Sequence, residues 1–335
     1  DEFGYWHLHG LLTNVADYPV GGFSLEVHIG DSPVADADSD GVFGVGPGAV
    51  QPFNLRLPQT VSSVDDFEVV VVDIQRISLN PVKLEIIQSQ LAAAENGIVT
   101  LVGEVQNTAS VPALIHSART GLFTAEEELV TTATCQVCPG YLLPSEKAPV
   151  QFLLYGHPAT AVVGEHQIYI AANEAPMVDG LVFNFEEPFH TYLDTTGGSH
   201  LLGDFQNSSD KTLALELTGT FYDQNGGIVG ASSYKLPVYA LPGETSPYEF
   251  ILADPLETVT DWSIRVELAR TSERIDPVYS LVSTGEEITK EENQWTVAGE
   301  AVNESGETLR LISVVVGLRE KGTGYLVGLA QQIKA

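Results

Sequence analysis

The hexapeptide VGEVQN at residues 102–107 carries most of the structural information in this sequence, because close variants of it recur along the chain. The other copies are HGLLTN at 9–14, LGDFQN at 202–207 and AGEAVN at 298–303. The closing residues Asn14, Asn107, Asn207 and Asn303 follow one another at intervals of 93, 100 and 96 residues. A period of about 100 residues is the length of one β-sandwich domain. The sequence therefore predicts a tandem array with one sandwich in each period.

Each copy combines a glycine with an asparagine at a fixed spacing. The glycine stands four positions before the asparagine, at Gly10, Gly103, Gly203 and Gly299. A glycine inside a strand suits a bulge or a close approach of backbones. The asparagine tolerates left-handed geometry and bonds its own backbone, so it is expected to end the strand with a turn.

The segments between these copies also predict strands. Apolar residues alternate with period two at Phe23, Leu25, Val27 and Ile29 and again from Leu213 to Phe221, which indicates half-buried strands. The Asn-Gly pair in TFYDQNGGIVG at 220–230 predicts a tight hairpin, and GLREKGTGYLVG at 317–328 repeats its shape. A turn-and-strand phrase recurs as GPGAVQPFNLRL at 46–57, LPSEKAPVQFLL at 143–154 and LPGETSPYEFIL at 241–252.

These patterns predict an all-β fold of tandem immunoglobulin-like β-sandwich domains, about four in number, with the last one incomplete. The expected domains are residues 1–80, with an acidic insertion, then 81–175, 176–273 and the incomplete 274–335.

The phrase TFYDQNGGIVG followed by LPGETSPYEFIL resembles the FxLYD-type immunoglobulin/fibronectin-III-like domain of archaeal and bacterial envelope proteins. The resemblance is clearest in residues 176–273. In the second domain the phrase has changed to GLFTAEEELV, and the first domain has an acidic insertion in its place. The resemblance implies an extracellular location and modular scaffolding, and it brings no catalytic residues.

Both ends depart from the period. The first repeat has nine residues before Gly10, and the fourth stops after its hairpin without counterparts of LPGETSPYEFIL and WSIRVELAR. A sandwich without two strands exposes backbone and apolar surface. Three explanations remain open: an excerpt of a longer repeat protein, strands donated by a neighbouring subunit, or a trimmed last repeat.

The amino-acid composition limits the kinds of partner that the chain can bind. The chain has 45 acidic and 15 basic residues and a formal net charge of −30, which repels nucleic acid and anionic membranes. The acidic surface keeps a secreted or salt-tolerant protein dispersed, and it also attracts cations such as calcium. The longest apolar runs are far shorter than the roughly 20 residues of a membrane span, so no membrane insertion is expected.

The acidic stretch DADSDG at 36–41 is the sharpest motif for a metal. Asp36, Asp38 and Asp40 followed by a glycine match the opening of a calcium loop. The twelfth position of that loop is Pro47 rather than glutamate, which excludes an EF-hand. A calcium site completed by other carboxylates and a solvated acidic hairpin tip are the two alternatives.

Other motifs are weaker. Cys135 and Cys138 form a lone CxxC, for which a local disulfide or two free thiols are favoured over a metal site. His7 and His9 should share one face of a strand, without a third ligand. Asn207 and Asn303 begin glycosylation sequons, although both are also turn residues of the repeat.

No catalytic motif is visible: G-x-S-x-G, H-E-x-x-H and a P-loop are all missing from the sequence. The leading hypothesis is a non-enzymatic extracellular structural protein, a component of a cell-surface stalk, sheath, surface layer or filament. It would contact other copies of itself or other envelope proteins, with β-strand addition as one mode of assembly. The alternatives are a ligand-binding or carbohydrate-binding adhesin and an accessory region of a larger secreted enzyme.

Overall fold

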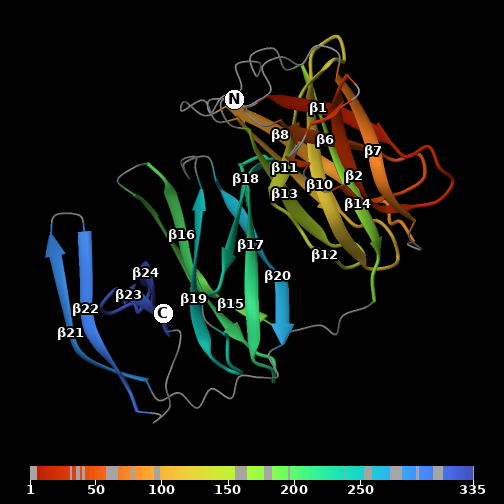
Figure 1. The fold of residues 1–335 in the computed structure, drawn as a ribbon. Coiled ribbons are helices and arrows are strands. Elements are labelled where there is room, and N and C mark those ends of the chain that lie inside the picture. Colours follow the sequence, from red (N-terminus) through yellow and green to blue (C-terminus); the bar gives the residue numbers. More distant parts are fainter. Residues whose placement is uncertain are drawn as a thin grey trace. The chain divides into compact units, whose positions relative to one another are not determined.

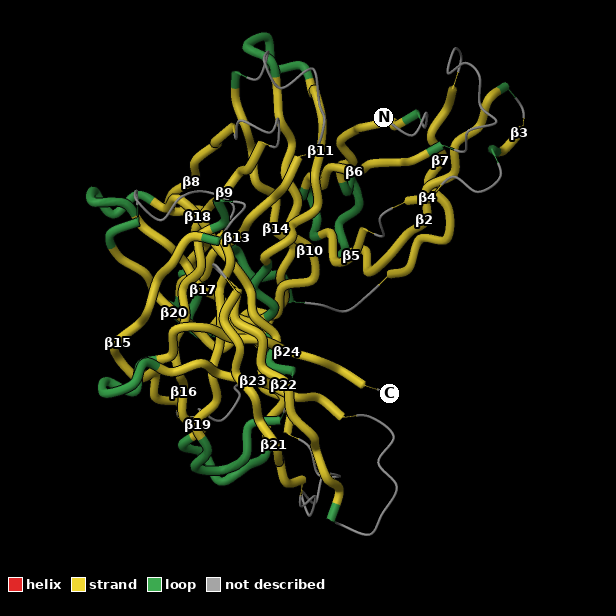
Figure 2. The backbone as a smooth tube through the Cα atoms, turned by 90° about the vertical axis from the view of Figure 1, so that its left-hand side faces the viewer, coloured by secondary structure: helices red, strands yellow, loops and turns green. Residues whose placement is uncertain are grey.

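The computed structural model describes residues 6–30, 32–34, 38–39, 42–57, 67–76, 80–93, 99–154, 164–176, 183–194, 197–237, 239–252, 259–271, 281–291, 294–304 and 312–334. These residues form strands β1 to β24 in several antiparallel sheets, drawn as arrows in Figure 1. Within the described ranges there is no helix, and Figure 2 shows only strands and loops. The predicted all-β class is therefore confirmed.

The chain forms two compact units. Unit 1 comprises Asp1–Asp179, Thr218–Ser233 and Glu257–Glu267, and unit 2 comprises Gly180–Leu217, Tyr234–Leu256 and Leu268–Ala335. The predicted third domain contributes residues to both units, and the count of four domains stays a prediction.

The first sandwich of unit 1 has two sheets. One has the order β1-β6-β4, and the other has the order β3-β2-β5 with β7 also pairing with β2. The bounds are β1 His7–Thr13, β2 Val20–Ile29, β3 Ser32–Pro33, β4 Asp38–Ser39, β5 Val42–Val45, β6 Val50–Arg56 and β7 Phe67–Arg76. Alternate residues of β2 and β6 point inward, so that Leu25, Val27 and Leu55 share one core.

The second sandwich contains one strand that takes part in both of its sheets. The strand order is β12-β10-β11-β13-β9-β8, and β14 also pairs with β10. The bounds are β8 Glu85–Ala93, β9 Val99–Gln106, β10 Ala113–Phe123, β11 Leu129–Val137, β12 Tyr141–Leu142, β13 Lys147–Leu154 and β14 Glu165–Glu174. β11 pairs first with β10 and then, from Cys135 on, with β13, and this second pairing has a register shift between Cys135 and Val137. The Cys135–Cys138 disulfide lies at this shift.

The remaining strands form three- and two-stranded sheets. β15, β16 and β19 belong to unit 2 and pair in the order β15-β16-β19, and a second sheet has the order β18-β17-β20. Unit 2 also contains the hairpins β21–β22 and β23–β24. The bounds are β15 Phe183–Leu193, β16 Ser199–Asn207, β17 Leu213–Tyr222, β18 Ile228–Lys235, β19 Thr245–Leu252, β20 Asp261–Thr271, β21 Leu281–Glu291, β22 Gln294–Asn303, β23 Ile312–Arg319 and β24 Leu326–Lys334. The hairpins predicted at 220–230 and 317–328 are β17–β18 and β23–β24.

The repeat asparagine is a buried cross-link. Asn107 is fully buried, and its side-chain amide donates to the carbonyl oxygens of Val111 at 2.9 Å and Leu142 at 3.0 Å. Its Oδ1 accepts the N–H of Ala109, two residues further on. The bond to the nearby N–H is the predicted turn. The bond to Leu142 joins two distant segments of the sandwich and was not predicted.

Asn14 and Asn207 make the same set of bonds. In each case the amide nitrogen donates to the carbonyl four residues further on and to a distant carbonyl, and Oδ1 accepts the N–H two residues further on. The distant carbonyls are those of Val45 and Ala240, at 2.9 Å in both cases. The arrangement therefore occurs three times among the residues that the structure describes.

A proline-containing turn completes each of these cross-links. In the second repeat, the backbone of Ser145 has φ +66° and donates to the Asn107 carbonyl, while the Asn107 N–H donates to Glu146. Gly48 and Gly243, each following a proline, hold the same position with φ +70° and +75°. A residue with positive φ after proline is typical of a type II turn, which explains the recurring P-G or P-S pair.

The repeat glycines make room for side chains. A Cβ atom on Gly10 would lie 2.3 Å from the ring of Phe53, its cross-strand neighbour. On Gly103 it would lie 2.9 Å from Cδ1 of Ile168. The predicted close approach is present at both positions, but the nearest atom belongs to a side chain rather than to a backbone.

Asn207→Ala should strongly destabilise the fold, because it leaves the carbonyl oxygens of Lys211 and Ala240 without their donor in a buried site. We expect a loss of about 3 kcal/mol in the free energy of unfolding. The matched control is Asn303→Ala, since Asn303 is the exposed member of the repeat and should cost less than about 0.5 kcal/mol. Urea unfolding followed by circular dichroism measures both, and equal losses would contradict the cross-link.

Candidate functional site: the seams between repeats

Among the described residues, side chains and backbone groups of one repeat contact the next repeat at three places, which we call the first, middle and last seams. The middle seam joins the second sandwich to residues 218–233 and 261–267, all within unit 1. The first seam also lies within unit 1, and the last seam lies within unit 2.

The middle seam has an apolar centre and a buried acid. β9 alternates, so that Leu101 and Val105 lie in the sandwich core while Val102 packs with Ile228 and Ala231. Glu104 lies on the same outer face and is only 4% exposed. The hydroxyl of Tyr222 donates to its Oε1 at 2.6 Å. Burial, helped by this bond, raises the pKa of Tyr222 to about 12.

Two glutamines bind the backbone of β18 across the same seam. Gln88 accepts the N–H of Ile228 at 3.1 Å, and Gln151 accepts the N–H of Ala231 at 2.9 Å. Because these donors belong to the main chain, the contacts fix the position of the strand independently of its side chains.

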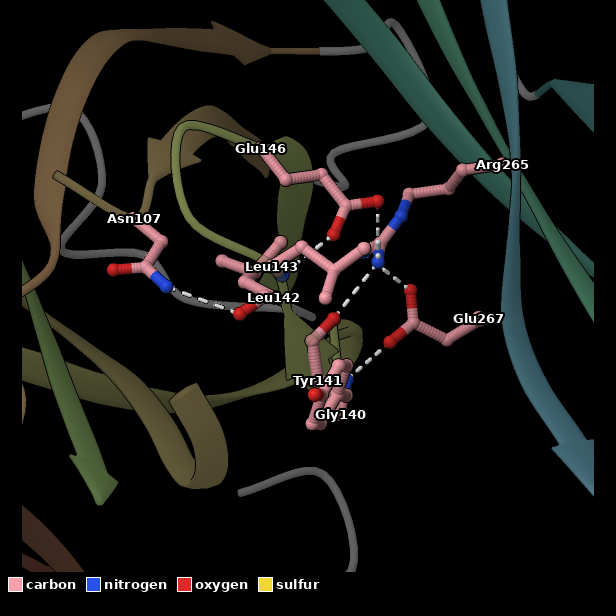
Figure 3. Close-up of polar contacts among 8 residues, drawn as sticks. All are labelled: Asn107, Gly140, Tyr141, Leu142, Leu143, Glu146, Arg265 and Glu267. Atoms are coloured by element: carbon pink, nitrogen blue, oxygen red, sulfur yellow. Dashed lines mark hydrogen bonds and ion pairs between the residues drawn. The ribbon is translucent and has the colours of Figure 1, made fainter. Parts of the chain in front are cut away.

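An arginine fixes the other end of the middle seam, as Figure 3 shows. Arg265 of β20 donates to the carbonyl of Tyr141 at 2.8 Å, to Glu146 at 3.2 Å and to Glu267 at 2.9 Å. Glu267 also accepts the N–H of Gly140. The cluster joins β20 to the loop that contains the cross-linked turn at Ser145.

The side chain of Glu267 is only 7% exposed in this cluster, and its surroundings act on its pKa in both directions. Burial raises the pKa of Glu267 above its ordinary value, while the Arg265 guanidinium and the backbone donors oppose that rise. A buried carboxylate of this kind is tolerated only while its donors are in place. The arrangement therefore suits a fixed joint between repeats.

The first seam uses the strands β1 and β6. Nδ1 of His9 lies 2.9 Å from Oγ1 of Thr132, and that hydroxyl lies 3.2 Å from the carbonyl oxygen of Phe53. The guanidinium of Arg119, which is buried, contacts the carbonyl of Pro52 at 3.5 Å.

The last seam contains a bidentate ion pair. Arg319, the last residue of β23, donates to both carboxylate oxygens of Asp204 at 2.8 Å. β24 packs against β15, β16 and β19, and Leu326 is buried there. Parallel two-point contacts of this kind are among the strongest charge-assisted bonds in proteins.

Equivalent repeat positions supply the middle and last seams. Glu104 and Asp204 both stand three residues before the repeat asparagine, and Tyr222 and Arg319 both end the strand that leads into a hairpin. Sequence reasoning missed this relation. The signal was present in the copies VGEVQN and LGDFQN, where an acid follows the glycine at a position that alternation turns away from the core.

A separate cluster surrounds a histidine in unit 2. His200 is nearly buried, with Nδ1 2.9 Å from Glu249 and Nε2 3.1 Å from Asp194. Its ring stacks on Tyr192 at 4.4 Å. Both ring nitrogens therefore lie within hydrogen-bonding distance of a carboxylate, so the cluster is suited to joining β16 to β19 and to the residue that follows β15.

Comparison with protein-family models and with curated proteins finds no match for this chain. The resemblance to the FxLYD-type domain therefore stays a prediction.

Of the three predicted calcium ligands, the structure describes only Asp38. Asp38 lies on β4, where its Cα partner is Arg56, and Asp36 and Asp40 lie outside the described residues. Among the described residues, no group of three His, Cys, Asp or Glu side chains is arranged to hold a metal ion. The calcium site remains a prediction.

The other predicted residues have definite places. His7 and His9 share a face, their rings stacked at 6.1 Å, and Nδ1 of His7 contacts Asn54. Asn207 is fully buried, and a glycan on its amide nitrogen would have to replace two hydrogen bonds, which argues against glycosylation of the folded chain. Asn303 is exposed. None of the described residues belongs to a helix that could cross a membrane.

Arg265→Met should weaken the middle seam, because it removes the cation that faces the buried carboxylate of Glu267. Removing one partner of a buried pair typically costs about 3–5 kcal/mol. Lys147→Ala is the matched control, since Lys147 is half exposed and 3.9 Å from Glu104, and it should cost less than about 1 kcal/mol. Urea unfolding followed by tryptophan fluorescence compares the two variants. Equal costs would show that Arg265 does not stabilise the seam.

Tyr222→Phe should change how stability depends on alkaline pH. The pKa of Tyr222 is raised to about 12 in the folded chain, so its contribution to stability is present below the ordinary value of 10.0 and is lost as the pH rises toward 12. The difference in unfolding free energy between wild type and Tyr222→Phe should therefore shrink between pH 9 and pH 12. Urea unfolding at several pH values measures it, and a constant difference would be the contrary result.

Proposed function

We propose that this protein is a non-enzymatic extracellular structural protein, a component of a cell-surface stalk, sheath, surface layer or filament. The observation that carries the proposal is the recurrence of the seam. Contacts join successive repeats at three places, and in two of them a buried acid accepts a bond from the end of a hairpin strand. Such contacts resist bending and torsion between repeats, which is the property that a structural array needs.

The disulfide and the charge support the extracellular location. Cys135 and Cys138 are joined in a disulfide, and such bonds persist in oxidising compartments. The net charge of −30 keeps copies dispersed until short-range contacts form. The partners proposed are other copies of this chain or other envelope proteins.

The proposal is tested by immunogold electron microscopy of the source cells with antibodies raised against the purified chain. We expect gold particles on intact cells, arranged along a stalk, sheath, layer or filament. Preimmune serum and an antibody against a cytoplasmic protein are the controls. Labelling that requires permeabilised cells would overturn the extracellular structural role.

A further inference from the structure

One edge of the strand β22 is unpaired among the described strands. The equivalent edge is occupied in the corresponding strands of the other repeats. The other strands with a repeat asparagine pair with a later strand of their own sandwich: β1 with β6, β9 with β13 and β16 with β19. β22 pairs with β21, and in the parts of the chain that the structure describes no strand pairs with its second edge.

The three occupied edges share one register. The repeat glycine faces a branched or aromatic apolar residue, and the residue after the glycine faces a proline. The facing tetrapeptides are PFNL at 52–55, PVQF at 149–152 and PYEF at 247–250. Each has a proline, a branched or aromatic apolar residue, a polar residue and a large apolar residue, so the three facing strands share a definite pattern.

Gly299 leaves space for such a residue, and no described side chain fills that space. A Cβ atom on Gly10 would collide with Phe53 at 2.3 Å. On Gly299 the nearest atom would be Cγ of Glu286 at 3.4 Å, an ordinary contact. The described neighbours of Gly299 therefore do not require a glycine, whereas an incoming aromatic or branched side chain does.

The face around Gly299 carries exposed apolar side chains, with the ammonium group of Lys290 placed over the ring of Trp295. Trp295 is 52% exposed and Ile288 is 58% exposed, and cross-strand register places both on the face of Gly299. Leu101 and Leu201 stand two residues before the glycine of their repeats, where Val297 stands in the fourth, and both are fully buried. An added strand would bury this face as β13 and β19 bury theirs.

We infer that the free edge of β22 binds a further β-strand with the pattern proline, branched or aromatic apolar, polar, large apolar. Its first apolar residue would face Gly299 and its proline would face Glu300. The backbone groups of the two strands would bond antiparallel, as in β-strand addition. This inference rests on the proposed structural role and specifies the chemistry of the partner.

The test uses a fluorescein-labelled peptide with the sequence of residues 243–252, GETSPYEFIL, and the full chain of 335 residues. We expect a saturable rise in fluorescence anisotropy with the wild type. Gly299→Val should weaken binding at least tenfold, because its side chain fills the space for the incoming residue. A peptide in which aspartate replaces the tyrosine and the phenylalanine should not bind.

Gly328→Val is the matched control, since Gly328 is also a strand glycine with its nearest side-chain atom at 3.4 Å. This variant should bind the peptide like the wild type, and circular dichroism shows whether both variants are folded. Equal binding to Gly299→Val, or no binding to the wild type, would overturn the inference. Surface labelling of intact cells is independent of this result, so a failed peptide experiment with retained labelling overturns the strand-binding edge alone.

Discussion

The hydrogen bonds of the repeat asparagine are the constraint on which the sandwiches depend. One side chain satisfies the carbonyl of its own turn and a carbonyl on a distant segment, while its backbone joins a proline-containing turn. A buried amide is costly unless every donor and acceptor is satisfied, so only one arrangement of these three segments is favourable. The cross-link therefore fixes where one strand ends and where a later one begins.

The same strand also organises the contacts between repeats. In β9, Gly103 faces the core and Glu104 faces the next repeat, and Asn107 directly follows the strand. Because strand residues alternate between faces, the core and the seam are specified by interleaved positions of one hexapeptide. Glu104 bonds Tyr222, whereas the side chain of Asn107 bonds the carbonyls of Val111 and Leu142, so the joint and the cross-link have separate partners. Because the seam position is distinct from the core positions, different residues can bond the acid there. Tyr222 does so in the middle seam and Arg319 does so in the last seam.

The period, the all-β class and the hairpins could be predicted because they depend on local signals: alternation, Asn-Gly pairs and proline turns. The distant residues that these segments contact could not be predicted. Tyr222 lies 118 residues from Glu104, and Arg319 lies 115 residues from Asp204. No local pattern specifies which hairpin meets which acid. The change of β11 from one sheet to the other could not be predicted either. It depends on the positions of both β10 and β13, which no local pattern in β11 specifies.

Basic residues are scarce in this chain, and two of them form ion pairs at the seams. The chain has 15 basic residues for 45 acidic ones, yet Arg265 and Arg319 are both used between repeats. Charges on the exposed surface repel at long range and are screened by salt over about 8–10 Å, whereas the pairs at the seams are close and partly buried. Salt therefore weakens the repulsion between acidic surfaces more than it weakens the joints. An acidic array built in this way keeps its internal joints at the salt concentrations at which separate copies can approach one another.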